Sequence, residues 1–248
     1  MEANRFIGMF YNLSEWVLRL LITNLLWVAF NIPIVYLILH LLVVKDMNEL
    51  AMVALTIAAL TPFVFFPATT AMFAVVRKWV MKETDISIIR SYVRYYKENY
   101  VRSMSGGFIL GAIWMIYLLD YYYFVLLKGD SFSSTVLFFL SIVFLITLMF
   151  LLIFTLNYIS YTVHLHEGLL KSFKDSIIIT IGHPLISISI CGLNGLIIYM
   201  SFTVVTFIIP FFMGVLLALV SFTGFYMIYL KVVAVKETQV RKECRSRW

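Results

Sequence analysis

Charged residues are scarce in this 248-residue chain, at 13% of the sequence, whereas hydrophobic residues make up 62%. A soluble globular domain is typically about 25% charged and about 45–50% apolar. Because so few polar side chains cannot cover the surface of a water-soluble fold, an ordinary soluble domain is excluded. Cysteine is also rare, with two residues, which excludes a small fold held together by disulfides.

Long apolar runs are what the chain has in abundance, and its mean hydropathy is +0.97. The hydrocarbon core of a bilayer is about 30 Å thick, which an α-helix crosses in about 20 residues. We therefore predict an all-α membrane protein, with the whole chain, 1–248, forming one transmembrane domain of six helices. The predicted spans are residues 20–43, 50–76, 103–127, 134–162, 184–208 and 211–230.

The basic residues predict the orientation of these spans. If the chain crosses six times, all but Lys45 and Lys128 of the 19 lysine and arginine residues fall on one side. Cytoplasmic segments of membrane proteins carry the excess of Lys and Arg. We therefore expect both termini inside the cell (N-in/C-in), together with a basic tail at 231–248. Because topology accounts for the net charge of +6, we expect no nucleic-acid partner.

Three inner segments have the pattern of amphipathic helices that lie on the membrane surface, with apolar residues such as Ile89 and Leu170 recurring at helical spacing. The second segment places Arg90, Arg94 and Lys97 on its polar face. These three side chains favour either the anionic inner leaflet of the lipid bilayer, at about 1 kcal/mol per basic residue, or a cytoplasmic protein partner. The three segments are residues 3–19, 85–101 and 167–181.

Polar residues inside the predicted spans have two interpretations. They could converge on a polar cavity for a small solute, or they could form separate interhelical hydrogen bonds, each worth about 0.6 kcal/mol. Asp120 stands among tyrosines near the outer end of its span, so it either anchors that end at the lipid headgroups or contributes to a ligand site facing the outer leaflet. The candidate cavity residues are Asn31, Thr69, Thr70, Asp120 and Asn157.

Proline and glycine indicate two features of helix geometry. Pro62 and Pro67 lie in one predicted span, and each removes a backbone donor, so we expect a helix break there that serves either function or packing. Gly107 and Gly111 form a Gly-x-x-x-Gly pair, which predicts close helix packing.

Enzyme motifs are missing from the sequence. No Walker A loop and no Gly-x-Ser-x-Gly elbow occurs, and His166-Glu167 lacks the second histidine of a zincin because Leu170 stands there. We therefore expect no enzyme activity, no catalytic residue, no metal site and no cofactor.

Five short stretches resemble one family: Asn31–Pro33, Pro67–Phe73, Arg77–Trp79, Lys97–Tyr100 at the end of the Tyr92–Tyr100 segment, and Asp120 with its run of tyrosines. Together they resemble the YesL-like family, bacterial integral membrane proteins described as a domain of unknown function. The most specific motif, Pro-Ala-Thr-Thr-Ala-Met-Phe, usually follows a glycine in that family, and Phe66 takes its place here.

The resemblance implies a location in the plasma membrane of a bacterium and a link to carbohydrate uptake or sensing, because genes of the family often neighbour those for sugar importers. We therefore expect a non-catalytic accessory or regulatory subunit whose partners are a sugar ABC permease, its ATPase or a sensor kinase. The alternative is a secondary transporter or channel for a small polar solute such as a saccharide.

Overall fold

The structure is a computed structural model that describes residues 2–128 and 132–246. Side chains are described within these ranges except at residues 2–7, 10, 126–127 and 235–246. The N-terminal part of the predicted surface helix at 3–19 and most of the predicted basic tail therefore have side chains outside the described residues.

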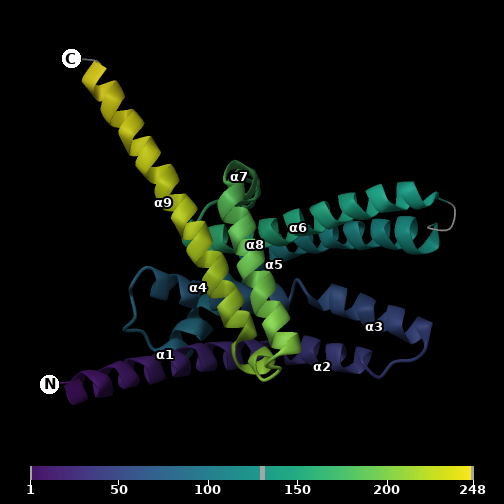
Figure 1. The fold of residues 1–248 in the computed structure, drawn as a ribbon, viewed down its shortest axis with the longest axis horizontal. Helices are drawn as coiled ribbons and strands as arrows, with labels where there is room; N and C mark the ends of the chain where they lie inside the picture. Colours follow the sequence, from purple (N-terminus) through teal and green to yellow (C-terminus); the bar gives the residue numbers. More distant parts are fainter. Residues whose placement is uncertain (1, 129–131, 247–248) are drawn as a thin grey trace.

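Helices form every regular element in the described ranges, as the sequence predicts. They pack around a central helix, α4, with paired helices extending to one side (Figure 1). The elements are α1 Glu2–Phe30, α2 Ile32–Leu41, α3 Met47–Leu60, α4 Phe65–Val80, α5 Ile88–Tyr121, the π-helical η1 Tyr122–Leu127, α6 Ser134–His164, α7 Leu169–Gly182, α8 Pro184–Thr203, the π-helical η3 Ile209–Met213 and α9 Gly214–Ser246.

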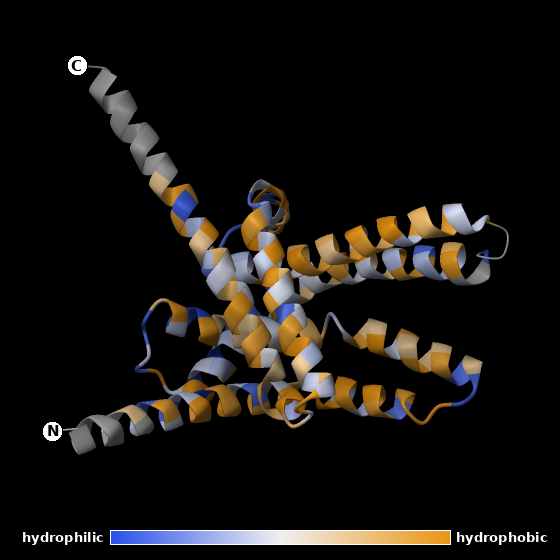
Figure 2. Cartoon of the chain, viewed as in Figure 1, coloured by the Kyte–Doolittle hydropathy of each residue, from blue (hydrophilic) through white to orange (hydrophobic). Residues whose placement is uncertain are grey.

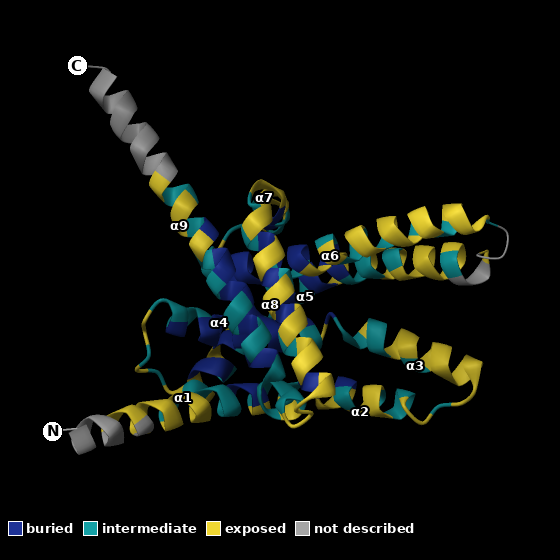
Figure 3. Cartoon of the chain, viewed as in Figure 1, coloured by how far each residue is buried: buried dark blue, intermediate teal, exposed yellow. Residues whose placement is uncertain are grey.

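Five of the described helices are long and apolar enough to cross a membrane, and the bent pair α3–α4 makes a sixth span if it is counted as one. The parts of α3 and α6 that extend away from α4 are mostly hydrophobic in Figure 2 and mostly exposed in Figure 3. Exposed apolar helix surface of this extent is what bilayer hydrocarbon would cover. The predicted surface helix at 3–19 and the start of the first predicted span belong to one helix, because α1 runs without a break from Glu2 to Phe30.

Helix α4 is the most deeply buried element. Every residue from Phe66 to Val76 is buried, and α4 packs against α1, α5, α6 and α9. In Figure 1, α8 and α9 cross the direction of the α5–α6 pair instead of running beside it. The spans therefore form a crossed bundle around α4 and not a ring of parallel hairpins.

The break that the prolines predict lies between α3 and α4. The two helices meet at an angle of 49°, and Pro62 stands in the four residues that separate them. Proline at this position cannot donate to the preceding turn, and its ring disfavours a straight helix. Pro67 lies in the first turn of α4, where its missing N–H costs no intrahelical hydrogen bond.

The predicted surface helix at 85–101 is not a separate element, because α5 continues from Ile88 through the membrane span to Tyr121. Its buried face is formed by Ser91, Tyr92, Tyr95 and Asn99, while Ile89 is 59% exposed. The hydroxyl of Tyr92 donates a hydrogen bond to the carbonyl of Ala68 in α4, at 2.8 Å. This segment therefore rests on protein.

The predicted close approach at Gly107 lies between α4 and α5. A Cβ added to Gly107 would lie 2.7 Å from Cδ2 of Phe66, the residue that stands in place of the usual glycine. Gly106, which the Gly-x-x-x-Gly spacing did not indicate, packs against the ring of Tyr158 in α6. At Gly111 the nearest atom to an added Cβ is Cγ of Pro62, at 4.0 Å, so this glycine makes no close approach.

We expect Gly107→Ala to lower the thermal unfolding midpoint of the detergent-solubilised protein, because overpacking against Phe66 costs about 1–3 kcal/mol. Gly111→Ala is the matched control in the same helix. It should leave stability unchanged or raise it by up to about 1 kcal/mol, the gain in helix propensity. Equal midpoints for the two variants would contradict the close approach at Gly107.

Candidate functional site

The five candidate cavity residues do not come together. Asn31, buried at the junction of α1 and α2, donates from its amide to the carbonyl of Trp27 in its own chain segment. Thr69 and Thr70 are buried in α4, Asn157 is buried in α6, and Asp120 is exposed at the far end of α5. Of the five, only Thr69 lines the largest described cavity.

Buried polar side chains instead pair off between helices, which is the second of the two interpretations. Each of these hydrogen bonds joins a different pair of elements, so together they connect most of the bundle. The pairs are Trp27 Nε1 to Thr69 Oγ1 at 3.0 Å, Trp114 Nε1 to Thr155 Oγ1 at 3.1 Å, Asn157 Nδ2 to Thr180 Oγ1 at 3.0 Å, and Asn194 Nδ2 to Ser221 Oγ at 2.9 Å.

Asn24 in α1 stabilises the irregular start of the last span. Its side-chain amide donates to the carbonyl of Pro210 at 2.7 Å, and its Oδ1 accepts from the backbone N–H of Val215 at 3.0 Å. Both backbone groups lie at η3 or directly after it, where Pro210 disturbs the helix. A single buried asparagine therefore satisfies a donor and an acceptor that the α-helical pattern leaves open.

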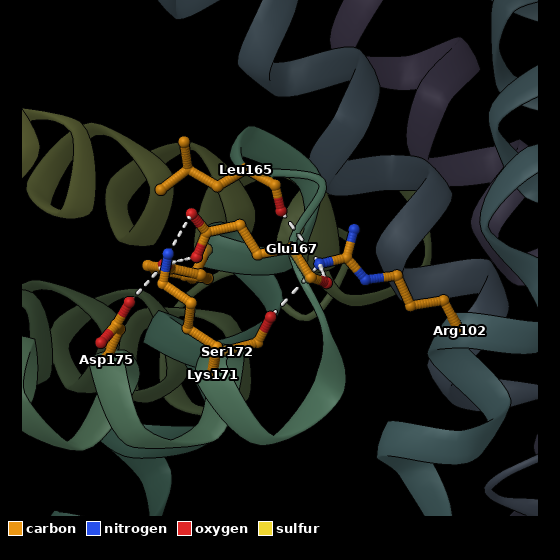
Figure 4. A network of polar contacts seen from close by, with 7 residues as sticks. Arg102, Leu165, Glu167, Lys171, Ser172 and Asp175 are labelled. Carbon is orange, nitrogen blue, oxygen red and sulfur yellow. Dashed lines mark hydrogen bonds and ion pairs between the residues drawn. The ribbon is translucent and has the colours of Figure 1, made fainter.

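A cluster of polar and charged side chains lies at the connection between α6 and α7 (Figure 4). Arg102 of α5 reaches this connection. Its Nη2 donates to the carbonyl of Leu165 at 3.0 Å, to the carbonyl of Glu167, and to Oγ of Ser172 at 3.2 Å. Since charge-assisted hydrogen bonds are the stronger kind, one guanidinium holds the whole turn against α5.

Glu167 is the second centre of the cluster. Its carboxylate accepts from Nζ of Lys171 at 2.7 Å and from the hydroxyl of Tyr161 at 2.6 Å, and Asp175 lies at the same distance from that hydroxyl. The hydrogen bond from Lys171, followed by that from Tyr161, holds the pKa of Glu167 below its ordinary value. The same bond raises the pKa of Lys171, so the pair is charged at neutral pH.

This cluster has a structural role, because it holds the turn between α6 and α7 against α5. Glu167 pairs with Lys171, and Nη2 of Arg102 points at the turn between α6 and α7, whereas Nε of Arg102 is buried without a partner among the described residues (Figure 4). In the sequence, Arg102 is marked only by its position, as the last arginine before the apolar part of α5.

The predicted docking residues Arg90, Arg94 and Lys97 are all exposed on α5. Arg94 lies 3.8 Å from Glu98 and is otherwise stacked at 5.0 Å from the ring of Tyr95. Because Tyr92 and Tyr95 fix the opposite face of this turn of α5 on the core, the three cations are presented from a rigid helix. Among the described residues, no three His, Cys, Asp or Glu side chains gather at one place that could hold a metal ion.

These features define an all-α, multi-pass membrane protein in which polar residues serve helix packing. Residues 20–121 match the family described as "Protein of unknown function, DUF624". The resemblance to the YesL-like family is thereby confirmed over this part of the chain.

The curated relatives come from Bacillus subtilis (strain 168). The uncharacterized protein YteU is 28% identical over 120 residues, which cover 48% of this chain and 43% of YteU. The uncharacterized protein YesL is 28% identical over 95 residues, covering 38% and 34%, and YesV is 34% identical over 62 residues, covering 25% and 30%. The chain thus spans less than half the length of these relatives, and no solved structure matches it.

We expect Arg102→Ala to loosen the turn between α6 and α7, because three acceptors lose a shared cationic donor and each such bond is worth about 1.5–3 kcal/mol. Hydrogen–deuterium exchange over residues 165–172 should accelerate. Arg94→Ala, which removes an exposed arginine from the same helix, is the control and should leave this exchange unchanged. If both variants exchange like the wild type, Arg102 does not hold the turn between α6 and α7 in place.

The stabilisation from Glu167 should depend on pH. Because the folded-state pKa is held below its ordinary value, the contribution is present above that value and disappears as the pH falls through the folded pKa. The difference in unfolding midpoint between wild type and Glu167→Gln should therefore stay constant down to about pH 4.5, the ordinary value, and shrink over the interval below it. Glu98→Gln on α5 should show no comparable trend. A difference that stays constant over this interval would contradict the assignment.

Proposed function

We propose that the protein is a non-catalytic accessory or regulatory subunit of a carbohydrate uptake or sensing system in the plasma membrane of a bacterium. The carbohydrate link rests on the resemblance to the YesL-like family. The bacterial plasma membrane is supported by the relatives from Bacillus subtilis and by the apolar helices. The partner in this proposal is a sugar ABC permease, its ATPase or a sensor kinase.

The proposal rests on the location of the polar side chains that another molecule could contact. Inside the bundle, Thr69, Asn157, Thr180 and Asn194 are engaged in interhelical pairs. On the surface, Arg90, Arg94 and Lys97 project from a part of α5 whose other face is buried. A rigid basic surface is suited to an acidic protein surface or to anionic lipid headgroups. Recognition by a surface is therefore better supported than chemistry within the membrane.

The orientation N-in/C-in belongs to this proposal. It follows from the basic residues, all but two of which lie on one side of a six-span chain. In this orientation the basic face of α5 is cytoplasmic, on the side where an ATPase or a kinase domain would be found. The turns that contain Lys45 and Lys128 then lie outside.

The alternative, a secondary transporter or channel for a saccharide, has less support. A sugar needs several convergent hydrogen-bond partners, but the cavity of about 510 Å³ beside α4 is lined mainly by apolar side chains and excludes four of the five candidate polar residues. No observation in the described structure favours this alternative over the subunit.

Reversing the charge of the basic face tests the proposal. The triple variant R90E/R94E/K97E should lose partner proteins that co-purify with the wild type from native membranes in mild detergent, because opposite charges at the contact become like charges. The control variant K45E/K128E changes exposed lysines in the two predicted outer turns and should retain them.

The identity of the recovered partner decides the function. Stoichiometric recovery of an importer subunit or a sensor kinase, lost in the triple variant only, supports the subunit. Recovery of the protein alone contradicts it, as does a sugar-system partner that both variants retain equally. A triple variant that still co-purifies its partner but no longer enriches anionic over zwitterionic lipid when it is purified from a mixed membrane would assign the basic face to lipid.

A further inference from the structure

A cavity of about 510 Å³ lies next to the break between α3 and α4. It is bounded by α4, α5, α6 and α8, which meet there from four directions. Its lining includes Phe65, Trp114, Leu152, Cys191 and Ile198. A volume between about 300 and 1,000 Å³ is the usual size of a small-molecule site.

Two features of the sequence create the space. The bend at Pro62 takes α3 out of line with α4 by 49°, and Thr61 and Phe65, on either side of Pro62, both line the cavity. Two glycines then omit the side chains that could fill it. A Cβ on Gly111 would come no closer than 4.0 Å to another atom, and a Cβ on Gly195 would meet nothing within 4 Å.

Water is a poor occupant of this cavity. A buried water needs about two to four polar partners. The lining threonines and Trp114 are engaged in hydrogen bonds of their own: Thr61 donates to the carbonyl of Ile57, and Thr155 accepts from Trp114. Oδ1 of Asn194 is the single lining side-chain atom that is buried without a partner in the described structure. One acceptor does not hold a water, so the cavity calls for an apolar occupant.

The side chains at the edge of the cavity indicate where the occupant comes from. Met149 and Leu152 of α6 and Ile198 of α8 are 36%, 40% and 42% exposed, and all three also line the cavity. They belong to helices long and apolar enough to span the membrane, so their exposed parts face bilayer hydrocarbon. The apolar lining is thus continuous with the surface that lipid covers.

We propose that this cavity is a binding site for one acyl chain of a membrane phospholipid. The chain enters between α6 and α8 and lies against the break at Pro62, with its headgroup left in the interface. It fills a space that would otherwise lack van der Waals contacts and so links α8 to α4 and α5. This inference is independent of the proposed function, because no residue of the basic face of α5 lines the cavity.

The test uses the full-length protein in nanodiscs made of phosphatidylglycerol that carries a photoreactive diazirine in the middle of one acyl chain. After illumination, peptide mass spectrometry locates the adducts. The wild type should be labelled at cavity residues such as Trp114 and Cys191, and at surface residues such as Phe139, which is 62% exposed. Excess unlabelled phosphatidylglycerol should remove cavity labelling more slowly than surface labelling, because a bound chain exchanges less readily than bulk lipid.

Two glycines of α8 provide a matched pair of variants. Gly195→Leu places a side chain in the cavity and should abolish labelling there while preserving surface labelling. Gly192→Leu lies one turn away, also has open space around its Cβ and does not line the cavity, so it should label like the wild type. Gly111→Leu fills the same cavity from α5 and should repeat the result of Gly195→Leu.

Thermal unfolding of each variant identifies any variant that fails to fold. If one of the two cavity variants, Gly195→Leu or Gly111→Leu, does not fold, the labelling of the other one tests the site. Loss of cavity labelling in a folded Gly195→Leu or Gly111→Leu, with labelling retained in Gly192→Leu, supports the site. Unchanged labelling in a folded cavity variant overturns it. Cavity and surface labels that exchange at the same rate also overturn it, since the cavity would then hold only bulk lipid.

Discussion

The burial of α4 on all sides is the constraint on which the rest of the bundle depends. In hydrocarbon, helices gain nothing from the hydrophobic effect by associating, so close packing and interhelical hydrogen bonds must hold them together. The segment from Phe66 to Val76 meets that requirement with small residues and two threonines, and four other helices surround it. Phe66 packs on Gly107, and Tyr92 bonds to the carbonyl of Ala68. The motif that carried the family resemblance is therefore a core-packing motif, and α5 is positioned by it.

The buried asparagines of this chain make separate hydrogen bonds and do not gather into one polar site. Asn24 satisfies backbone groups beside Pro210, Asn157 joins α6 to α7, and Asn194 joins α8 to α9. Each of them provides a hydrogen-bond partner in a region where no water is available to do so. The concentrated charges lie instead at the turn between α6 and α7, where Arg102 engages backbone carbonyls. This division leaves an apolar cavity and a basic outer face of α5 as the features that are open to other molecules.

The sequence was sufficient for the class of the protein and for its local breaks. Apolar run lengths predicted the spanning helices, and Pro62 predicted the bend. The apolar pattern did not predict which side chains of α5 and α7 are buried. In α7 the buried residues are Ser172, Ser176 and Thr180, whereas Leu170 is 84% exposed, and α5 likewise buries Ser91 and exposes Ile89. Where lipid is the solvent, small polar faces turn inward and apolar faces turn outward, the reverse of the rule for soluble proteins. Convergence of distant residues, such as Arg102 with Leu165, depends on helix crossings that no local pattern specifies.

The length of α5 has a mechanical consequence. At about 1.5 Å per residue, its 34 residues extend about 51 Å, well beyond a hydrocarbon core of about 30 Å. The helix has no break along that length, and it is fixed on α4 both at Tyr92, near its start, and at Gly107. Its basic first turns and its apolar part are therefore one rigid piece. The place of Arg90 on the surface is set by the same contacts that position the span, so neither can shift without the other.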